Sequence, residues 1–130
     1  MRDGNLSELL KRHLPSWHWV RIESAGTGAG IPDLNGCKAG VEVWIECKRL
    51  IGGKKVDLSA FQATWLERRA RVGGRTFVAA RDNETFLLFS GARASELRMF
   101  GVKPVSVLFS RIGGMRDEDW SEVERCLTKS

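Results

Sequence analysis

The chain has 130 residues with an ordinary share of hydrophobic and charged side chains, which excludes a disordered polypeptide and favours one folded domain over residues 1–130. Lys and Arg outnumber Asp and Glu by 21 to 16, a formal net charge of +5 that suits a polyanionic partner. Apolar runs fall short of the ~20 residues of a membrane span and no signal peptide is evident, so we expect a cytoplasmic protein without a membrane partner.

The first elements surround a glycine-rich stretch. Helical spacing of leucines predicts a helix over residues 5–13, and alternation predicts a strand over 17–24. After the glycines at 25–30 the chain resumes an extended path, Asn35-Gly36 indicates a tight turn, and residues 41–48 read as a strand. We therefore expect Asp33 and Glu46 to lie on neighbouring strands.

The second half of the chain predicts a helix over residues 58–72, opened by an Asp57 cap and buried through its apolar side chains at Leu58, Phe61, Trp65 and Val72. The elements that follow are two strands, a short helix, a strand and a last helix, over residues 75–80, 84–89, 92–100, 105–109 and 117–127. This order predicts an α/β fold with a central mixed β-sheet flanked by helices, its core at about 5–90 and a strand and helix extension at about 92–130.

The predicted strand at 41–48 carries the residues best suited to chemistry. Glu46 and Lys48 are two positions apart and share one face of the strand, whereas Cys47 points to the other. If Asp33 approaches Glu46, the two carboxylates repel each other unless a cation neutralises them, and Mg²⁺ meets that need. A carboxylate pair, a hard cation and an ammonium together suit phosphodiester hydrolysis.

These residues resemble a known signature. Gly30-Ile-Pro-Asp33, eleven intervening residues and then Ile45-Glu46-Cys47-Lys48 are similar to the bipartite motif of the PD-(D/E)XK nuclease superfamily. Within it the chain most resembles VRR-NUC and Holliday junction resolvase-like nucleases, in which Leu-Ser-x-x-Gln-x-x-Trp/Phe opens a helix, as in Leu58 to Trp65 here. The resemblance implies a single-domain restriction-endonuclease-like fold.

The resemblance also implies roles for individual residues. Asp33 and Glu46 would bind Mg²⁺, for which Mn²⁺ would substitute, and Lys48 would serve the attacking water. The Cys47 backbone carbonyl would complete the metal site, Gln62 would support the site from the helix, and Glu8 would be an additional metal ligand. Candidate DNA contacts are the following: Ser24, Gly28, Lys54, Lys55 and Arg69.

Simpler interpretations stand beside these roles. Asp33 could satisfy backbone amides at a turn after Pro32, Glu46 and Lys48 could be a solvent-facing pair, and a helical glutamine is ordinarily solvated. The lysines and arginines could form a merely solvated face. Cys37, Cys47 and Cys126 contain no CxxC pair, so neither a disulfide framework nor a zinc site is indicated.

By resemblance, the expected activity is a divalent-metal-dependent, structure-selective DNA endonuclease from a bacterial or phage context, acting as a homodimer on branched DNA. Trp120, Val123 and Leu127 could supply part of the self-complementary surface. One alternative is a restriction or repair nuclease that acts on flaps or duplex. Another is a DNA-binding module without catalysis.

Overall fold

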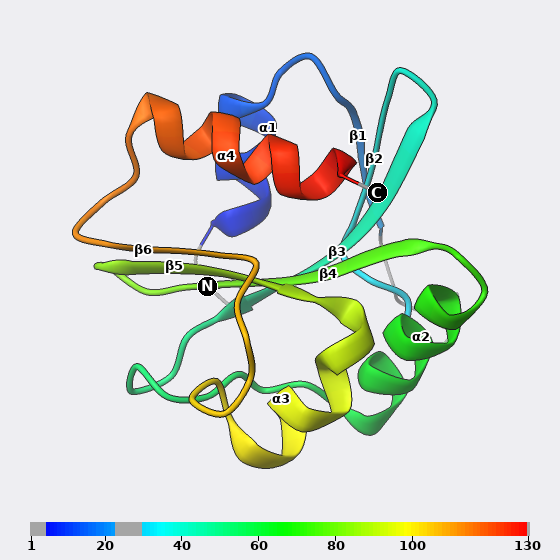
Figure 1. Ribbon diagram of the computed structural model, residues 1–130, viewed down its shortest axis with the longest axis vertical. Helices are drawn as coiled ribbons and strands as arrows, with labels where there is room; N and C mark the ends of the chain where they lie inside the picture. Colours follow the sequence, from blue (N-terminus) through cyan, green and yellow to red (C-terminus); the bar gives the residue numbers. More distant parts are fainter. Residues whose placement is uncertain (1–4, 23–29, 130) are drawn as a thin grey trace.

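A computed structural model describes residues 5–22 and 30–129, so the expected DNA contacts Ser24 and Gly28 lie outside the described residues. Its six strands form one sheet in the order β1-β2-β3-β4-β5-β6 (Figure 1). Among the strands of these described residues only β3 and β4 pair in parallel, and the other neighbours are antiparallel. The strands are β1 His18–Arg21, β2 Leu34–Lys38, β3 Val41–Arg49, β4 Arg75–Arg81, β5 Thr85–Ser90 and β6 Phe109–Ile112.

Helices cover both faces of the sheet (Figure 1). On one face α1 (Leu6–His13) and α4 (Asp117–Thr128) bury leucines and Trp120 against the odd-numbered side chains of β3, among them Ile45 and Cys47. On the other face α2 (Ala60–Arg71), the 3₁₀ turn η1 (Gly91–Arg93) and α3 (Ala94–Phe100) enclose a second apolar cluster around Leu66, Val78 and Phe89. The predicted mixed sheet flanked by helices is confirmed.

The hairpin that joins β2 and β3 does not turn where the sequence indicated. Asn35 and Gly36 lie inside β2, and the turn is formed by Ala39 and Gly40, both with positive φ (51° and 82°). A two-residue turn with both φ values positive matches the twist of the flanking strands. Gly36 instead leaves room for the Trp19 ring, because a Cβ at this position would lie 2.4 Å from that ring.

Helix α2 also differs from the prediction. Its cap is Ser59 rather than Asp57, and its buried side chains are Ala63 and Leu66. Phe61 and Val72, expected in the core, are 67% and 81% exposed. Leu58 is buried as expected and Trp65 is half-buried, so the predicted burial holds for part of the expected apolar set only.

The C-terminal third belongs to the same sheet and core. The strand expected at 105–109 is instead β6, three to four residues later in the chain, where it pairs with β5. Trp120, Val123 and Leu127 are buried in the cluster shared with α1. The expectation that these three residues form part of a dimer surface is therefore wrong, because they face their own sheet.

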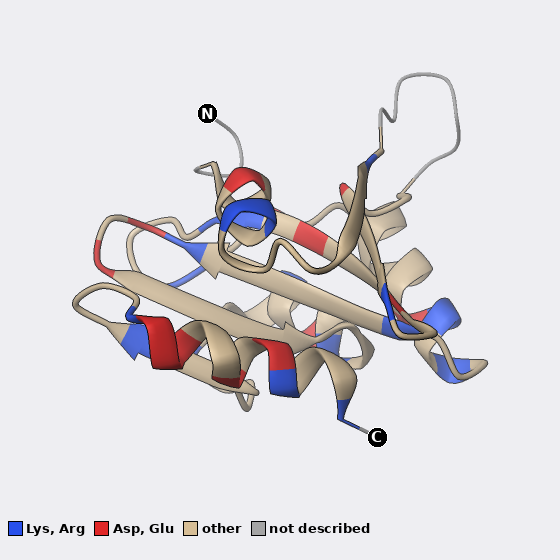
Figure 2. Cartoon of the chain, turned by 90° about the horizontal axis from the view of Figure 1, so that it is seen from above, with Lys and Arg blue, Asp and Glu red and all other residues tan. Residues whose placement is uncertain are grey.

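The two helical layers carry opposite charge. Helix α2 has three arginines against one glutamate, whereas α4 has five acidic residues against one arginine. The acidic bands of α4 are visible beside the C-terminus in Figure 2. Within the described ranges, no helix is long and apolar enough to cross a membrane.

Candidate active site

The β2–β3 register places Asp33 opposite Glu46. Leu34 pairs with Ile45, so the next antiparallel position back joins Asp33 to Glu46, and directly opposed residues share a face of the sheet. The Asp33 carboxylate accepts a hydrogen bond from the Cys47 backbone N–H at 3.1 Å. Gly30 allows the chain to reach this position, because a Cβ there would lie 2.2 Å from the Phe61 carbonyl of α2.

Glu46 is the most unusual carboxyl group of the described residues, since it is only 1% exposed in the centre of the sheet. Its Oε2 accepts a hydrogen bond from Gln62 Nε2 at 3.1 Å and lies 3.5 Å from Lys48 Nζ. Its Oε1 is buried and has no hydrogen-bond partner among the described residues. One oxygen of this carboxylate thus lacks the hydrogen bond that a buried polar atom normally makes.

Burial raises the pKa of Glu46 from 4.5 to about 8, because the charged form is poorly solvated inside the protein. The neighbouring Asp33 raises this pKa further, through its charge and through a hydrogen bond that the protonated carboxyl can make, and the Lys48 ammonium opposes both effects. A shared proton or a bound cation would therefore relieve the repulsion between the two carboxyl groups.

Gln62 is held through its side chain and its backbone by Ser59, the residue that caps the start of α2. Its side-chain Oε1 accepts from the Ser59 backbone N–H at 3.0 Å, and the Ser59 hydroxyl accepts from the Gln62 backbone N–H at 3.1 Å. This reciprocal pair is a capping box, for which the sequence Ser-x-x-Gln is suited. With Oε1 occupied, the Gln62 amide points its N–H group at Glu46, so the start of the helix orients the carboxylate.

The carboxylate pair, the unpartnered oxygen and the nearby ammonium fit a divalent cation. The described part of the chain contains no group of three or more His, Cys, Asp or Glu side chains placed to hold a metal ion. Ligands beyond Asp33 and Glu46 would have to be backbone carbonyls, water or substrate oxygens, as Mg²⁺ readily accepts. The role predicted for the Cys47 carbonyl stays a prediction; the Cys47 thiol lies in the core on the opposite face.

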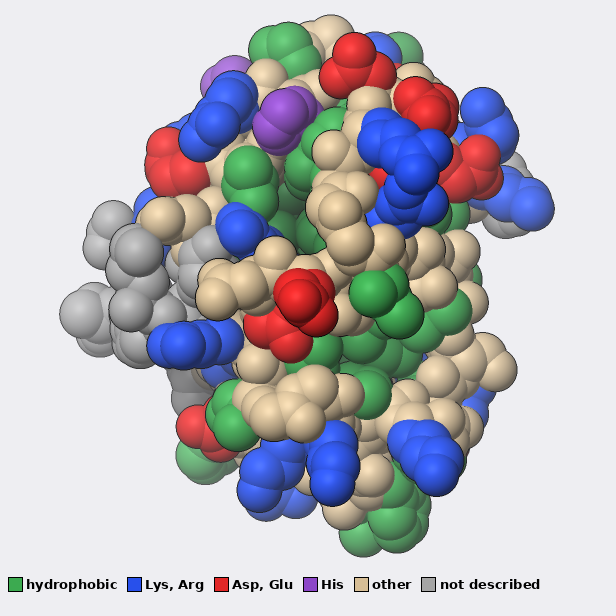
Figure 3. Space-filling view, turned by 90° about the vertical axis from the view of Figure 1, so that its left-hand side faces the viewer, with side chains coloured by type: hydrophobic (Ala, Val, Ile, Leu, Met, Phe, Trp, Pro, Cys, Tyr) green, Lys and Arg blue, Asp and Glu red, His purple; other side chains and the backbone are tan. Residues whose placement is uncertain are grey.

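The remaining predicted residues lie apart from this centre. Glu8 is on α1, across the sheet from α2, and its carboxylate pairs with Lys11 at 3.7 Å. Lys54 and Lys55 are exposed in the segment that joins β3 to α2. On the side of the molecule drawn in Figure 3, Lys and Arg side chains form separate groups rather than one stripe. Their roles in metal or DNA binding stay predictions.

Arg69 is placed by two tryptophans, and the sequence analysis assigned no role to one of them, Trp44. Its guanidinium lies 4.6 Å from the ring centre of Trp65 and 5.6 Å from that of Trp44. Trp44 is two residues before Glu46 in β3, so strand alternation could have placed it on the same face as the carboxylate. Arg68 and Thr64 also line this surface.

This chain is similar in fold to proteins of known structure. No protein-family model and no curated protein matches the sequence. The Holliday junction resolvase Hjc of the archaeal hyperthermophile Archaeoglobus fulgidus is similar, with a TM-score of 0.49 and 22% sequence identity over 65% of this chain and 73% of that chain. A likeness at this level assigns no function, so the chemistry of this chain follows from the residues of its own site.

Proposed function

We propose that this chain is a divalent-metal-dependent, structure-selective DNA endonuclease of the PD-(D/E)XK type, with the VRR-NUC and Holliday junction resolvase-like nucleases as its kin. The observation that carries the proposal is the buried Glu46 carboxylate, which faces Asp33 and Lys48 and has one oxygen without a partner among the described residues. A protein gains nothing in stability from such a group, and carboxyl groups of this kind concentrate at functional sites.

Asp33 and Glu46 would hold the cation, Mg²⁺ by preference or Mn²⁺, with the Cys47 carbonyl as a third protein ligand. When bound, the cation would polarise a phosphodiester oxygen and lower the pKa of a coordinated water. The chain's contribution is a pair of anionic ligands fixed by the sheet register. The Cys47 N–H holds Asp33 and the Gln62 amide holds Glu46, so little reorganisation is needed for binding.

Lys48 would act on the reacting groups. Its ammonium is only partly exposed and lies 3.5 Å from Glu46, on the same face of β3. From there it can position the attacking water or stabilise the negative charge that develops on the phosphate. Gln62 is a positioning residue in this scheme, since it acts through its hydrogen bond to Glu46.

The charge of the two helical layers supports DNA as the substrate and indicates which face meets it. The carboxylate pair lies on the α2 side of the sheet, where arginines predominate, and the acidic helix α4 covers the opposite side. A phosphate backbone would be attracted to the face with the site and repelled from the other.

Cleavage of a branched junction would use a homodimer, because a four-way junction presents two equivalent strands to two equivalent sites. Sedimentation at micromolar concentration with and without junction DNA tests this part. Monomer alone under both conditions would remove the simplest basis for paired incision, while leaving flap or duplex cleavage as the activity.

The decisive experiment is cleavage of labelled four-way junction, flap and linear duplex in Mg²⁺ or Mn²⁺ by wild type, Glu46→Ala and Glu42→Ala. Glu42 is the matched control, because it lies on the same face of β3 but is exposed and pairs with Asn35. We expect paired, symmetric nicks on the junction from wild type and Glu42→Ala, and none from Glu46→Ala.

Other results select among the alternatives. Equal cutting of every substrate would retain the nuclease and reject junction selectivity. Cutting that persists in Glu46→Ala would reject the site itself. Binding without cutting in either metal would identify a DNA-binding module without catalysis.

A further inference from the structure

The outer surface of α2 forms a groove that the proposed chemistry does not use. We call it the α2 groove and define it by its lining residues Phe61, Thr64, Trp65, Arg68, Arg69 and Val72. Its volume is about 720 Å³, within the size range of sites that accept small ligands. It is therefore large enough for a nucleotide-sized group.

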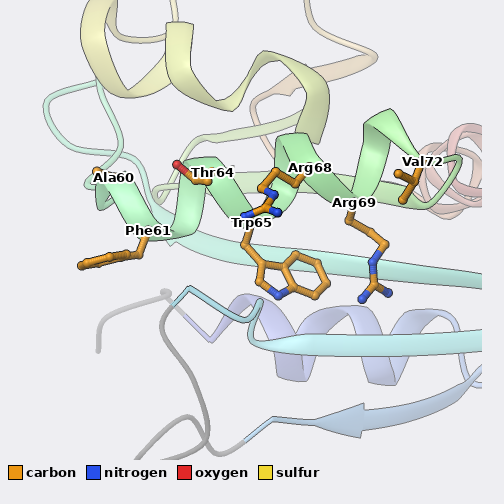
Figure 4. Close-up of a pocket in the computed structure, with 7 residues that line it drawn as sticks. All are labelled: Ala60, Phe61, Thr64, Trp65, Arg68, Arg69 and Val72. Atoms are coloured by element: carbon orange, nitrogen blue, oxygen red, sulfur yellow. The ribbon is translucent and has the colours of Figure 1, made fainter.

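A row of side chains along one side of α2 shapes the groove. Phe61, Trp65 and Arg69 follow one another at intervals of four residues and point to the same side of the helix (Figure 4). The Arg69 guanidinium rests 4.6 Å from the Trp65 ring centre, and the Trp65 and Trp44 rings lie 5.3 Å apart. Arg69 and Trp65 are thus already packed together with Trp44 of β3, and Phe61 at the end of the row is exposed to a partner.

One end of the groove is next in the chain to the residue that orients Glu46. Phe61 directly precedes Gln62, whose amide donates to Glu46. At the strand side, Trp44 precedes Glu46 by two positions on the same face of β3. A chain lying along the groove would therefore run toward the carboxylate pair.

The charge of the lining distinguishes between possible occupants. Both charged residues that line the groove are arginines. An isologous contact with a second copy would bring these arginines toward their own equivalents, which is unfavourable. A nucleic acid strand instead offers phosphates to the guanidinium groups and flat bases to the aromatic rings.

We propose that the α2 groove binds an unpaired DNA strand, with one base stacked on Phe61 and the backbone phosphates held by Arg68 and Arg69. The inference rests on the proposed function, since a nuclease is what brings DNA to this face, and it names the part of the substrate that the site selects. Unpaired strands occur at flaps and at branch points that have opened but not in continuous duplex, so the groove supplies a physical basis for structure selectivity.

Phe61 is the residue that tests the proposal. It is 67% exposed, so its replacement leaves the core intact, and Phe100 at the end of α3 is a matched control with 66% exposure. The experiment measures fluorescence anisotropy of a labelled single-stranded oligonucleotide and of a duplex of equal length, in EDTA to prevent cleavage. The proteins are wild type, Phe61→Ala, Phe61→Trp and Phe100→Ala, each checked by circular dichroism.

We expect Phe61→Ala to bind the single strand about tenfold more weakly, since one stacked base contributes roughly 5- to 150-fold to affinity. Phe61→Trp should bind as wild type does, because it retains an aromatic face, and Phe100→Ala should be unchanged. Duplex binding should change much less in every variant. Equal single-strand affinity of wild type and Phe61→Ala would overturn the proposal.

A second readout separates DNA from a second copy of the chain. If Phe61→Ala dissociates a dimer in sedimentation but leaves single-strand affinity per protomer unchanged, the groove is a subunit interface and the proposal is wrong. Failure of the proposed function would look different. Wild type would then cleave no substrate, while the Phe61-dependent affinity for the single strand measured in EDTA would persist.

Discussion

Replacing Glu46 by glutamine should stabilise the metal-free protein at alkaline pH, although it should abolish catalysis. The glutamine amide has the shape of the protonated carboxyl and can still accept from Gln62 and donate to Asp33. Unlike the carboxylate, it carries no charge that must be desolvated. The variant therefore removes the electrostatic cost of the site while keeping its packing.

The magnitude follows from the pKa of Glu46, which rises from 4.5 to about 8 on folding. A raised pKa means that the folded state prefers the protonated carboxyl, so its contribution to stability is complete below pH 4.5 and is lost as the pH rises toward 8. Between pH 5 and pH 8 the wild type should lose about 3–4 kcal/mol through this one group. That is a large share of the roughly 5–15 kcal/mol that stabilises a typical domain.

Urea unfolding of both proteins in EDTA, at several pH values from 5 to 8, measures the difference. The two stabilities should nearly coincide at pH 5 and separate progressively at higher pH, with the variant more stable. Adding Mg²⁺ at pH 8 should then stabilise the wild type and have little effect on the variant, because ligand binding to the folded state raises its stability. Parallel pH profiles for the two proteins would refute the assignment of the raised pKa to Glu46.

Three further substitutions test the surrounding structure. Lys48→Met removes the ammonium that would act on the reacting groups, so cleavage should fall to background. The same ammonium lowers the pKa of Glu46, so without it the urea midpoint should keep decreasing above pH 8, and a plateau at pH 8 would contradict this. Ser59→Ala removes the cap of α2 and should cost about 1 kcal/mol in urea unfolding, whereas Ser59→Thr should cost little. Gly36→Ala would place a Cβ 2.4 Å from the Trp19 ring and cost about 1–3 kcal/mol in the same assay, and Trp19→Leu in the same chain should restore part of that loss.

The pairing of Asp33 with Glu46 was predicted from the sequence for a reason that proved incorrect. A hairpin turning at Asn35-Gly36 would have paired Asp33 with Lys38, eight residues from Glu46. The observed turn at Ala39-Gly40 makes the pairing possible. Alanine rarely adopts a positive φ, so nothing local marked this turn, and the glycine at position 36 gave the stronger signal although it serves the Trp19 contact.

The predicted order of elements succeeded because it depends on short-range periodicity, whereas burial depends on what lies opposite each face. Phe61 and Val72 are apolar, yet α2 turns Ala63 and Leu66 toward the sheet instead. The converse holds for Trp120, whose apolar row predicts a dimer surface but packs against the protein's own sheet. Apolar spacing identifies a face of a helix but not the neighbour that covers it.

The opposite charges of α2 and α4 give the molecule an electric dipole across the sheet. A polyanion approaching at random would exert a torque that turns α2 and the carboxylate pair toward it before contact, which raises the rate of productive encounters. This orientation acts over roughly the Debye length, about 10 Å at 0.1 M salt. The association rate should therefore fall with salt more steeply than the dissociation rate rises, and a negatively charged sensor surface should capture the protein with α4 outward.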